Sequence, residues 1–511
     1  MTAREYHDRT THTPASVRTS GHTLEWDIKP FPFKVYTDLP AISLPREIEP
    51  IGVDTLAALA EPAPPSSSLS LSGLAAVLYY AAGVTKKKTY PGGGEVLFRA
   101  AASTGALYQT EVYVAAGEVR GLEPGLYHFC PGDFALRRLR GGDVRGALAA
   151  FAANDTIARR SATIVLTAIY WRNAWKYQAR AYRHLFWDSG TMLANLLAVG
   201  GTLGLAPSVL TGFVDAEVNR LLGLDAAREA ALELIVLGPE TAAAPDGAGL
   251  DPIEHTTLPL SSSAVDYPLI REMQEASSLA TPSAVRAWRG HSREVAARPL
   301  DAELVRLPPP RARAGRGLGE TIQRRGSTRE FGHASLTAEE LATTLWAASR
   351  PLDADAPGGL VDLYLIVNAV EGISSGAYFY RPDAHALETL AVGDFRNRSA
   401  YLCLEQPLGG DAAAVIYWLA RLDALTATFG DRGYRLANLE AGLAGGRAYL
   451  AAYAQGFGAS GLTFYDRLVV EFFSPHAAGK DAIFVTALGR SGVGGRVTID
   501  STLTTRRRSS A

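Results

Sequence analysis

The sequence predicts an α+β protein built from two unequal copies of one unit, each a mostly antiparallel sheet packed with helices. Three observations support this prediction: the length of the chain, an internal repeat, and the alternation of helical and strand-like patterns within each copy. The chain has 511 residues, of which 47% are hydrophobic, which suffices for two or three conventional cores. We therefore expect two folded units in one chain.

The repeat is clearest in two segments of equal length. KYQARAYRHLFWDSG (residues 176–190) aligns without gaps on TFGDRGYRLANLEAG (residues 428–442). Arg180, Tyr182, Arg183 and Gly190 recur as Arg432, Tyr434, Arg435 and Gly442, and Asp188 corresponds to Glu440. Offsets of 251 or 252 also relate 121–129 to 372–380 and 235–238 to 485–489, whereas 71–83 match 337–350 at an offset of 267. A steady offset predicts a tandem repeat with about sixteen additional residues in the first copy.

Each copy has the same predicted order of elements. An apolar helix leads to a strand ending near Tyr113 or Tyr364, a hairpin passes through Gly125 or Gly376, and long helices and a final strand follow. Stretches rich in proline and glycine mark loops. The predicted organisation is an N-terminal extension (1–65), a first copy (66–240), a connecting segment (241–317), a second copy (318–500) and a disordered tail (501–511).

Composition and charge exclude several classes of protein. The formal charge of −2 gives no basic excess for nucleic acid or an anionic membrane. The two cysteines, Cys130 and Cys403, are far apart and lack metal-ligand spacing. The N-terminus has no signal-peptide pattern, and the most apolar stretch (193–213) is interrupted by glycines and a proline. We expect a cytoplasmic protein without a metal, a nucleic-acid partner or a membrane span.

The second copy opens with a cluster suited to a phosphate. In QRRGSTREF, Arg325, Ser327 and Arg329 stand just ahead of a helical pattern. Guanidinium groups give bidentate charge-assisted bonds, a hydroxyl adds a donor, and a helix N-terminus adds its dipole. The alternative is an ordinary solvated turn.

This R-x-S-x-R-x-F pattern resembles the phosphate-binding opening motif of nitroreductase-like flavoproteins. The resemblance implies that Arg325, Ser327 and Arg329 bind flavin mononucleotide (FMN). In that family the end of the domain contributes a backbone turn and a basic residue after the last strand. The corresponding residues here are Gly456, Phe457, Gly458 and Arg490.

The additional residues of the first copy carry a different motif. Arg99, Ser103, Gly105 and Leu107 precede Glu111 in a pattern that resembles the flavin-facing arm of SagB-type dehydrogenases, which oxidise azolines in modified peptides. Small residues there let backbone amides approach the flavin edge. The arm departs from the family pattern in having Ala102 where a proline often precedes the serine. The alternative is a flexible glycine-rich loop.

Lys176 and Tyr177 resemble the catalytic pair of the same SagB-type branch, and the second copy has Thr428 and Phe429 instead. Azoline oxidation removes a proton from carbon, so it requires a base, and a neighbouring ammonium would lower the pKa of a phenol from ~10. The alternative is that the pair caps an exposed helix face. For Arg180 and Arg183 we expect a symmetric packing role against Asp188 and Glu440, with a grip on substrate as the alternative.

The two copies have kept complementary parts of the expected site. The first copy offers LAEPAPP (58–64) where the second has the Arg-Ser-Arg motif, and the second has DADAPGG (353–359) where the first has the Ser-Gly arm. Ordinary nitroreductases are homodimers with a flavin at each interface site. The resemblance therefore implies a pseudo-dimer with one composite pocket and one FMN per chain.

Three functions remain open from the sequence. One is an FMN-dependent dehydrogenase or oxidase of a peptide or peptide-like substrate, plausibly converting azoline to azole in peptide natural-product biosynthesis, with oxygen reoxidising the flavin. The second is an NAD(P)H-dependent FMN reductase of quinones or nitro compounds. The third is a non-catalytic scaffold among other peptide-modifying enzymes.

Overall fold

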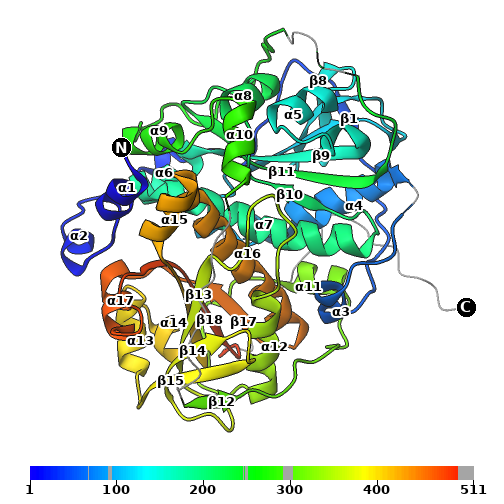
Figure 1. The fold of residues 1–511 in the computed structure, drawn as a ribbon. Coiled ribbons are helices and arrows are strands. Elements are labelled where there is room, and N and C mark those ends of the chain that lie inside the picture. Colours follow the sequence, from blue (N-terminus) through cyan, green and yellow to red (C-terminus); the bar gives the residue numbers. More distant parts are fainter. Residues whose placement is uncertain (67, 90–94, 246, 248–250, 292–302, 493–511) are drawn as a thin grey trace, which may run out of the picture.

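The computed structural model describes residues 1–66, 68–89, 95–245, 247, 251–291 and 303–492, so the expected tail at 501–511 lies outside it. Two α+β units lie against each other, with one sheet in the upper and the other in the lower part of Figure 1. We call residues 3–240 the first unit and residues 268–489 the second unit. No helix in the described part of the chain is long and apolar enough to cross a bilayer.

Each unit contains a seven-stranded sheet in which all neighbouring strands are antiparallel. The first sheet has the order β1 (Ala41–Ser43), β8 (Ala135–Gly141), β7 (Gly125–Cys130), β5 (Thr110–Ala116), β9 (Arg160–Ile169), β11 (Glu229–Glu240), β10 (Ser208–Leu210). The second has the order β12 (Leu304–Arg306), β15 (Ala386–Val392), β14 (Gly376–Arg381), β13 (Val361–Val367), β16 (Ala414–Ala420), β18 (Asp481–Gly489), β17 (Gly458–Gly461). The predicted α+β architecture of two mostly antiparallel units is confirmed.

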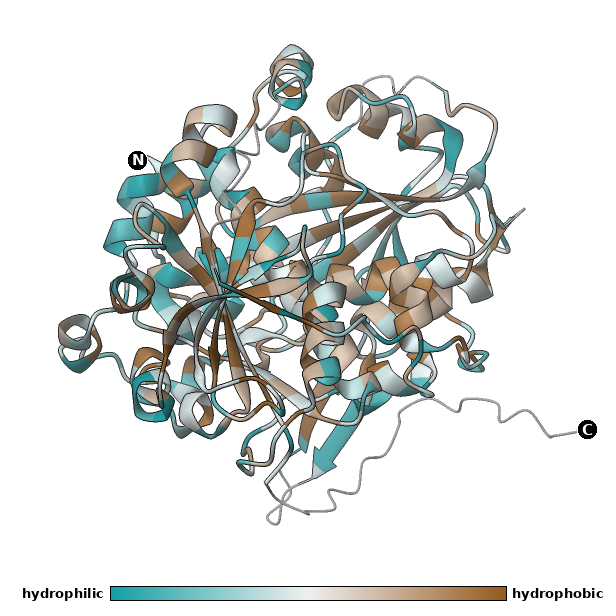
Figure 2. Cartoon of the chain, turned by 60° about the horizontal axis from the view of Figure 1, so that its bottom comes forward, coloured by the Kyte–Doolittle hydropathy of each residue, from teal (hydrophilic) through white to brown (hydrophobic). Residues whose placement is uncertain are grey.

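The central strands of both sheets are buried on both faces. β5 and β16 are buried at every residue and are rich in β-branched and aromatic side chains, which favour the pleated conformation. Figure 2 shows hydrophobic strands in the interior of the molecule, and one hydrophobic core is continuous through both units. The units therefore fold around a shared interior.

Two long helices cross at the centre of the molecule, α7 (Ala181–Thr202) and α16 (Arg432–Ala454) (Figure 1). A Cβ atom at Gly190 would lie 2.6 Å from the carbonyl oxygen of Leu439, and one at Gly442 would lie 2.5 Å from that of Trp187. Only glycine permits such close backbone approach. The glycine shared by the two repeats is thus explained by the crossing of the helices.

The repeated arginines bind a carboxylate of the opposite unit. Arg180 and Arg183 contact Asp466 at the start of α17 (Asp466–Phe473), at 2.9 and 2.6 Å. Arg432 and Arg435 contact Asp215 at the start of α8 (Asp215–Leu222), both at 2.7 Å. All six side chains are buried. The expected symmetric role is present, but the expected partners were wrong.

Asp188 and Glu440 instead hold the segments that precede the β5 and β13 strands. Glu440 accepts hydrogen bonds from the amides of Leu360 and Val361, at 2.7 and 3.1 Å. Asp188 accepts from the amide of Thr104. On α7 and α16, the side chains of Asp188 and Glu440 therefore face these segments and not the repeated arginines.

The repeat also includes the N-terminal helices. α1 (Ala3–Arg9) and α2 (Pro14–Arg18) correspond to α9 (Pro268–Ala276) and α10 (Pro282–Arg289). Arg4-Glu5, Thr13-Pro14 and Val17-Arg18 recur as Arg271-Glu272, Thr281-Pro282 and Val285-Arg286. 

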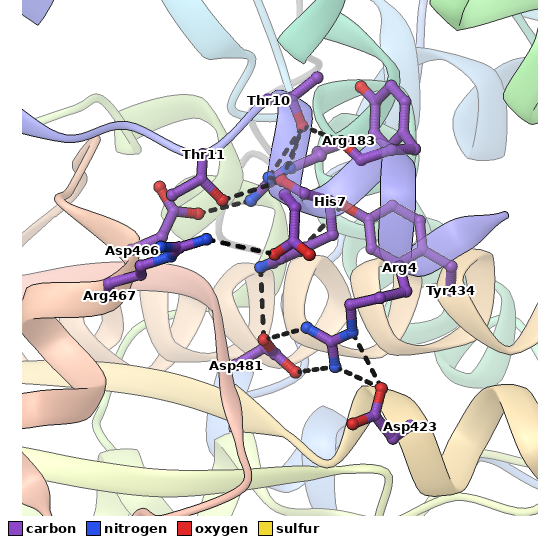
Figure 3. A network of polar contacts seen from close by, with 12 residues as sticks. Arg4, His7, Thr10, Thr11, Arg183, Asp423, Tyr434, Asp466, Arg467 and Asp481 are labelled. Atoms are coloured by element: carbon purple, nitrogen blue, oxygen red, sulfur yellow. Dashed lines mark hydrogen bonds and ion pairs between the residues drawn. The ribbon is translucent and has the colours of Figure 1, made fainter. Parts of the chain in front are cut away.

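Their contacts recur as well. The amide of His12 donates to Asp466 at 2.8 Å, as that of Leu279 donates to Asp215 at 2.9 Å. Arg183 donates to the carbonyl of His7 at 2.7 Å in the network of Figure 3, and Arg435 donates to that of Gln274 at 2.8 Å. Each unit thus begins with a helical pair that covers the buried arginines.

Candidate functional site

The Arg-Ser-Arg motif lies between the two units. It follows the end of α11 (Leu318–Arg324), and residues 330–337 separate it from α12 (Ala338–Ala348), so the expected helix N-terminus is not at the motif. The buried guanidinium of Arg325 donates to the first unit's Arg99 and Ala100 carbonyls, at 3.0 and 2.8 Å. The motif is thereby fixed to the arm of the opposite unit.

A lysine missed by the sequence analysis lies against the same motif. Lys86 of β3 (Val84–Thr89) donates to the carbonyls of Arg324 and Arg325, at 2.7 and 2.6 Å. Burial, together with the nearby charge of Arg325, lowers the pKa of Lys86 to about 8. Within the described residues, no carboxylate forms an ion pair with Lys86, Arg325 or Arg329. The run of three lysines, TKKKTY, was the available signal.

The expected turn lies beside the motif. The amide of Thr328 donates to the Ala459 carbonyl at 3.0 Å, and a Cβ at Gly458 would lie 2.0 Å from the Thr328 hydroxyl. Gly456 has φ +90°, and Phe457 is buried next to it. The Ser327 hydroxyl lies 3.1 Å from that of Tyr449. The turn therefore packs against Thr328, and Tyr449 positions Ser327.

Arg490 is turned away from this group. Its guanidinium binds the carboxylate of Glu340 at 2.8 Å and donates to the Ser335 carbonyl at 3.1 Å. Its main chain remains near the motif, because Gly332 donates to the Arg490 carbonyl at 3.0 Å. The structure does not bring the Arg490 side chain together with Arg325 and Ser327.

The arm of the first unit is organised by Asp188. The carboxylate accepts hydrogen bonds from the Ser103 hydroxyl (2.5 Å), the Thr104 hydroxyl (2.7 Å) and the Gln109 amide (2.8 Å). Burial raises the pKa of Asp188 to about 6, although these hydrogen bonds oppose the shift. Gly105 (φ +63°) lies in the short η2 turn (Thr104–Ala106), and Leu107 is buried behind it. Asp188 thus fixes the conformation of the arm.

Arg99 has a structural position within the arm. Its buried guanidinium donates to the carbonyl of Pro32 at 2.5 Å and lies over the rings of Phe33 and Tyr108. Burial lowers its pKa to about 10. It is the main-chain carbonyl of Arg99, rather than its side chain, that meets Arg325.

Lys176 and Tyr177 end α6 (Tyr170–Tyr177) directly against this arm. A Cβ at Gly105 would lie 3.0 Å from the Tyr177 hydroxyl, so glycine leaves room for the phenol. The Lys176 ammonium lies 5.4 Å from the Tyr177 ring centroid. Arg329 of the second unit acts electrostatically on both side chains. The structure therefore brings the pair, the Ser-Gly arm and the Arg-Ser-Arg motif together.

The pKa shifts of the pair differ from the sequence-based rationale. Burial raises the pKa of Tyr177, the charge of Asp188 raises it further, and Arg329 only partly opposes them. Burial lowers the pKa of Lys176, and the charges of Arg329 and Lys29 lower it further. The shifts favour the neutral form of Lys176, which can accept a proton, and the protonated form of Tyr177.

A series of hydrogen-bonded side chains next to Tyr177 determines the tautomer of His184. Asp188 accepts from Gln109 (2.8 Å), Gln109 accepts from Asn173 (3.2 Å), and Asn173 Oδ1 lies 2.8 Å from His184 Nδ1. A carboxylate only accepts when ionised, so this order assigns the proton of His184 to Nδ1. Its ring packs on that of Tyr177, with centroids 4.4 Å apart. Gln109 and Asn173 gave no distinctive signal in the sequence.

The symmetry-related second pocket is filled by the protein itself. The Asp355 carboxylate accepts from the amides of Thr211 and Gly212, at 2.7 and 3.1 Å, and pairs with Arg289 at 2.9 Å. The indole of Trp288 donates to the Phe429 carbonyl at 3.1 Å. Residues of α10 and of the 353–359 segment thus occupy this position.

Two neighbouring cavities run along α6. The larger, of about 1140 Å³, is lined by Tyr170, Trp171, Glu229 and Tyr267 among others. The smaller, of about 320 Å³, shares Trp171, Val265 and Tyr267 with it and reaches Gln178, which follows Tyr177 directly. The larger cavity thus adjoins the smaller one, which reaches the residue after Tyr177, and its lining includes no residue of the Arg-Ser-Arg motif.

Comparison with known proteins identifies the family. The model of the nitroreductase family matches residues 49–238 and 322–477, more than half of the chain. A crystal structure described as a nitroreductase of Anabaena variabilis is 28% identical and superposes with a TM-score of 0.76 over 96% of this chain and 99% of that one.

Three curated relatives match shorter stretches. MJ1384 of Methanocaldococcus jannaschii, named as a nitroreductase, is 29% identical over 31% of this chain and 76% of its own length. The trifolitoxin-processing protein TfxB of Rhizobium leguminosarum bv. trifolii is 30% identical over 35% of this chain and 49% of its own length. The microcin B17-processing protein McbC of Escherichia coli is 26% identical over 24% of this chain and 47% of its own length. The matches to TfxB and McbC thus span about half the length of each.

The repeat, the paired antiparallel sheets and these matches agree, and the expected tandem, SagB-type nitroreductase-like form is confirmed. The chain belongs to the nitroreductase family.

Proposed function

We propose that the protein is an FMN-dependent dehydrogenase of a peptide or peptide-like substrate, which it oxidises from azoline to azole. The observation that carries the proposal is the meeting of Lys176 and Tyr177 with the Gly105 arm and with Arg329 of the opposite unit. Similarity to TfxB and McbC, which process trifolitoxin and microcin B17, supports a peptide substrate and a role beside other peptide-modifying enzymes.

The charges of the site fit a phosphate monoester such as that of FMN. Lys86, Arg325 and Arg329 contribute three cationic side chains without a carboxylate partner among the described residues, and Ser327 adds a hydroxyl. A dianionic group would balance this charge through charge-assisted hydrogen bonds. We assign the phosphate to Lys86, Arg325, Ser327 and Arg329, with the 456–458 turn beside them, and the flavin edge to Ser103, Gly105 and Leu107. Arg490 would join only if it left Glu340.

Oxidation of an azoline removes a proton and a hydride from the ring. FMN, when bound, supplies the hydride acceptor, and oxygen takes the electrons onward. Lys176, with its lowered pKa, takes the proton from carbon, and the neutral Tyr177 hydroxyl donates a hydrogen bond that orients the ring. Asp188 holds the arm in place through Ser103 and Thr104.

The filled second pocket supports one FMN per chain. Asp355, Trp288 and Arg289 occupy the region that corresponds to the first pocket, and the first unit has no counterpart of Arg325, Ser327 and Arg329. A pocket that lacks these three residues, and whose 353–359 segment is held by Asp355, would bind no second flavin.

The family supports a second candidate, an NAD(P)H-dependent reductase of quinones or nitro compounds. Its specific support is that MJ1384 and the Anabaena variabilis protein are described as nitroreductases. The two candidates differ in the electron donor.

Purified protein separates these candidates. We expect a yellow protein with about one FMN per chain that oxidises a thiazoline-containing peptide in air, and a Tyr177→Phe variant that keeps its flavin but turns over more slowly, because it lacks the hydroxyl that orients the ring. Rapid bleaching by NADH or NADPH without peptide oxidation would instead favour the reductase. A colourless protein that takes up no FMN would contradict both and leave a scaffold.

A further inference from the structure

The helical pairs at the start of the two units differ in the residues near their C-terminal ends. Val17-Arg18 of α2 aligns with Val285-Arg286 of α10, so Ser20 and Gly21 correspond to Trp288 and Arg289. The first unit therefore has a serine and a glycine at the two positions where the second unit has a tryptophan and an arginine.

In the second pocket, the indole of Trp288 is a built-in occupant. It donates to the carbonyl of Phe429 at 3.1 Å, and its ring centroid lies 6.1 Å from that of Phe429. The guanidinium of Arg432 lies 5.8 Å from the indole. A planar aromatic group with a hydrogen-bond donor thus fits beside the residue that corresponds to Tyr177.

In the first unit, the residues aligned with Trp288 and Arg289 line an open cavity. The cavity of about 320 Å³ is lined by Ser20 and Gly21 on one side and by Trp171, Trp175, Gln178 and Tyr267 on the other. The two wall indoles already donate their N–H groups, Trp171 to Ser261 and Trp175 to the Glu25 carbonyl, both at 2.9 Å. Their rings form the aromatic part of a wall that polar residues, among them Glu25 and Gln178, complete.

We propose that this cavity is a subsite for a planar aromatic side chain of the peptide substrate, beside the residue that is oxidised. Aromatic walls favour an aromatic guest over a small aliphatic one. The adjoining cavity of about 1140 Å³ continues from the shared Trp171, Val265 and Tyr267, and receives the flanking residues of the same peptide. The assignment to a peptide rests on the proposed function.

The test converts the first pocket into the second at one position. Ser20→Trp introduces the side chain that fills the second pocket, and Thr19→Trp adds the same bulk at an exposed neighbour that does not line the cavity. Binding of N-acetyl-L-tryptophanamide and N-acetyl-L-alaninamide is measured by calorimetry on FMN-saturated protein. We expect the wild type and Thr19→Trp to prefer the tryptophan amide by roughly tenfold or more, and Ser20→Trp to lose that preference while keeping its FMN.

Two results would overturn the subsite: equal binding of both amides by the wild type, or unchanged preference in Ser20→Trp. Kinetics with thiazoline peptides carrying tryptophan or alanine beside the ring then separate the two proposals. If the amides behave as expected but neither peptide is oxidised, the subsite stands and the proposed function fails. If both peptides are oxidised at equal rates, the subsite fails and the function stands.

Discussion

The two pockets of this molecule differ far more than the two units that form them. Both units share the sheet topology, the long central helix and the pair of buried arginines. The arginines of the first unit bind Asp466, and those of the second bind Asp215 in the same way. One pocket combines a Lys-Tyr pair with cationic side chains that have no carboxylate partner in the described part of the chain. The other is closed by Asp355 and Trp288. The residues that join the units are therefore repeated in both copies, whereas the residues of the candidate site are not.

The closed pocket also gives a physical reason for the loss. In a homodimer, every substitution acts on both sites, so neither can be abandoned. Once the two copies lie in one chain, the second pocket can be filled with indole, guanidinium and carboxylate groups that satisfy one another, as Arg289 and Asp355 do at 2.9 Å. Filling a cavity stabilises the fold, and the first pocket keeps its space for ligands.

The largest expected effect separates Lys176 from its counterpart Thr428. Lys176→Met removes the group that we propose to take the proton, so turnover of a thiazoline peptide should fall by on the order of 10²- to 10⁴-fold, the usual contribution of a general base. Steady-state kinetics at saturating FMN measure this. Thr428→Ala, in the second unit, is the matched control and should retain turnover. An equal loss of turnover in both variants would contradict the proposal that only the first unit supplies the base.

The arginine clusters offer a comparison in which the units should behave alike. Asp466→Asn and Asp215→Asn each leave two buried guanidinium groups without a charged partner, which costs about 3–5 kcal/mol of unfolding free energy. Urea denaturation of the two variants measures it. Asp8→Asn, an exposed partner of Arg467 at 3.8 Å, should cost under about 1 kcal/mol. A large difference between Asp466→Asn and Asp215→Asn would show that the symmetric contacts are not energetically equivalent.

The sequence predicted the fold well because the repeat is carried by buried residues. Gly190 and Gly442 recur because the crossing helices exclude any Cβ, and the buried arginines recur because each must meet a carboxylate. The partners of those arginines were mispredicted. Asp188 lies on the same helix as Arg183, but the binding carboxylate, Asp466, lies 283 residues further along the chain. Such a pairing depends on how the units dock, which periodicity does not reveal.

Candidate site residues were predictable where a motif carried them and unpredictable where only tertiary packing did. Lys176, Tyr177 and Gly105 come together as the motifs implied. Lys86 reaches the site only because β3 passes beside Arg325, and the pKa of Tyr177 is raised because burial outweighs nearby positive charge. A search at a constant offset does not reveal the correspondence of α2 with α10, because their alignment requires one inserted residue, Ala280.

A smaller effect tests whether the first unit contributes to the phosphate site. Lys86→Met keeps the length of the side chain and removes its charge, and a hydrogen bond to a charged group contributes about 1.5–3 kcal/mol, so FMN should bind about 10- to 100-fold more weakly. Equilibrium titration by flavin fluorescence gives the affinity. Lys87→Met is the control, because this neighbouring lysine pairs with Glu95. Unchanged affinity in Lys86→Met would assign the phosphate to the second unit alone.

The smallest expected effect is a shift in pH dependence that crosses the interface between the units. The proposed base must be neutral, so kcat/KM should rise with pH until it passes the pKa of Lys176, which burial and then the charge of Arg329 lower. Arg329→Met removes that charge, so the pKa of Lys176 rises and the ascending limb moves to higher pH. The profile is measured at saturating FMN, because Arg329 is also a proposed phosphate ligand. Arg324→Met removes a nearby charge that Glu320 already pairs at 2.7 Å and should leave the profile in place. An ascending limb unmoved by Arg329→Met, or one absent from the wild type, would remove Lys176 from the role of base.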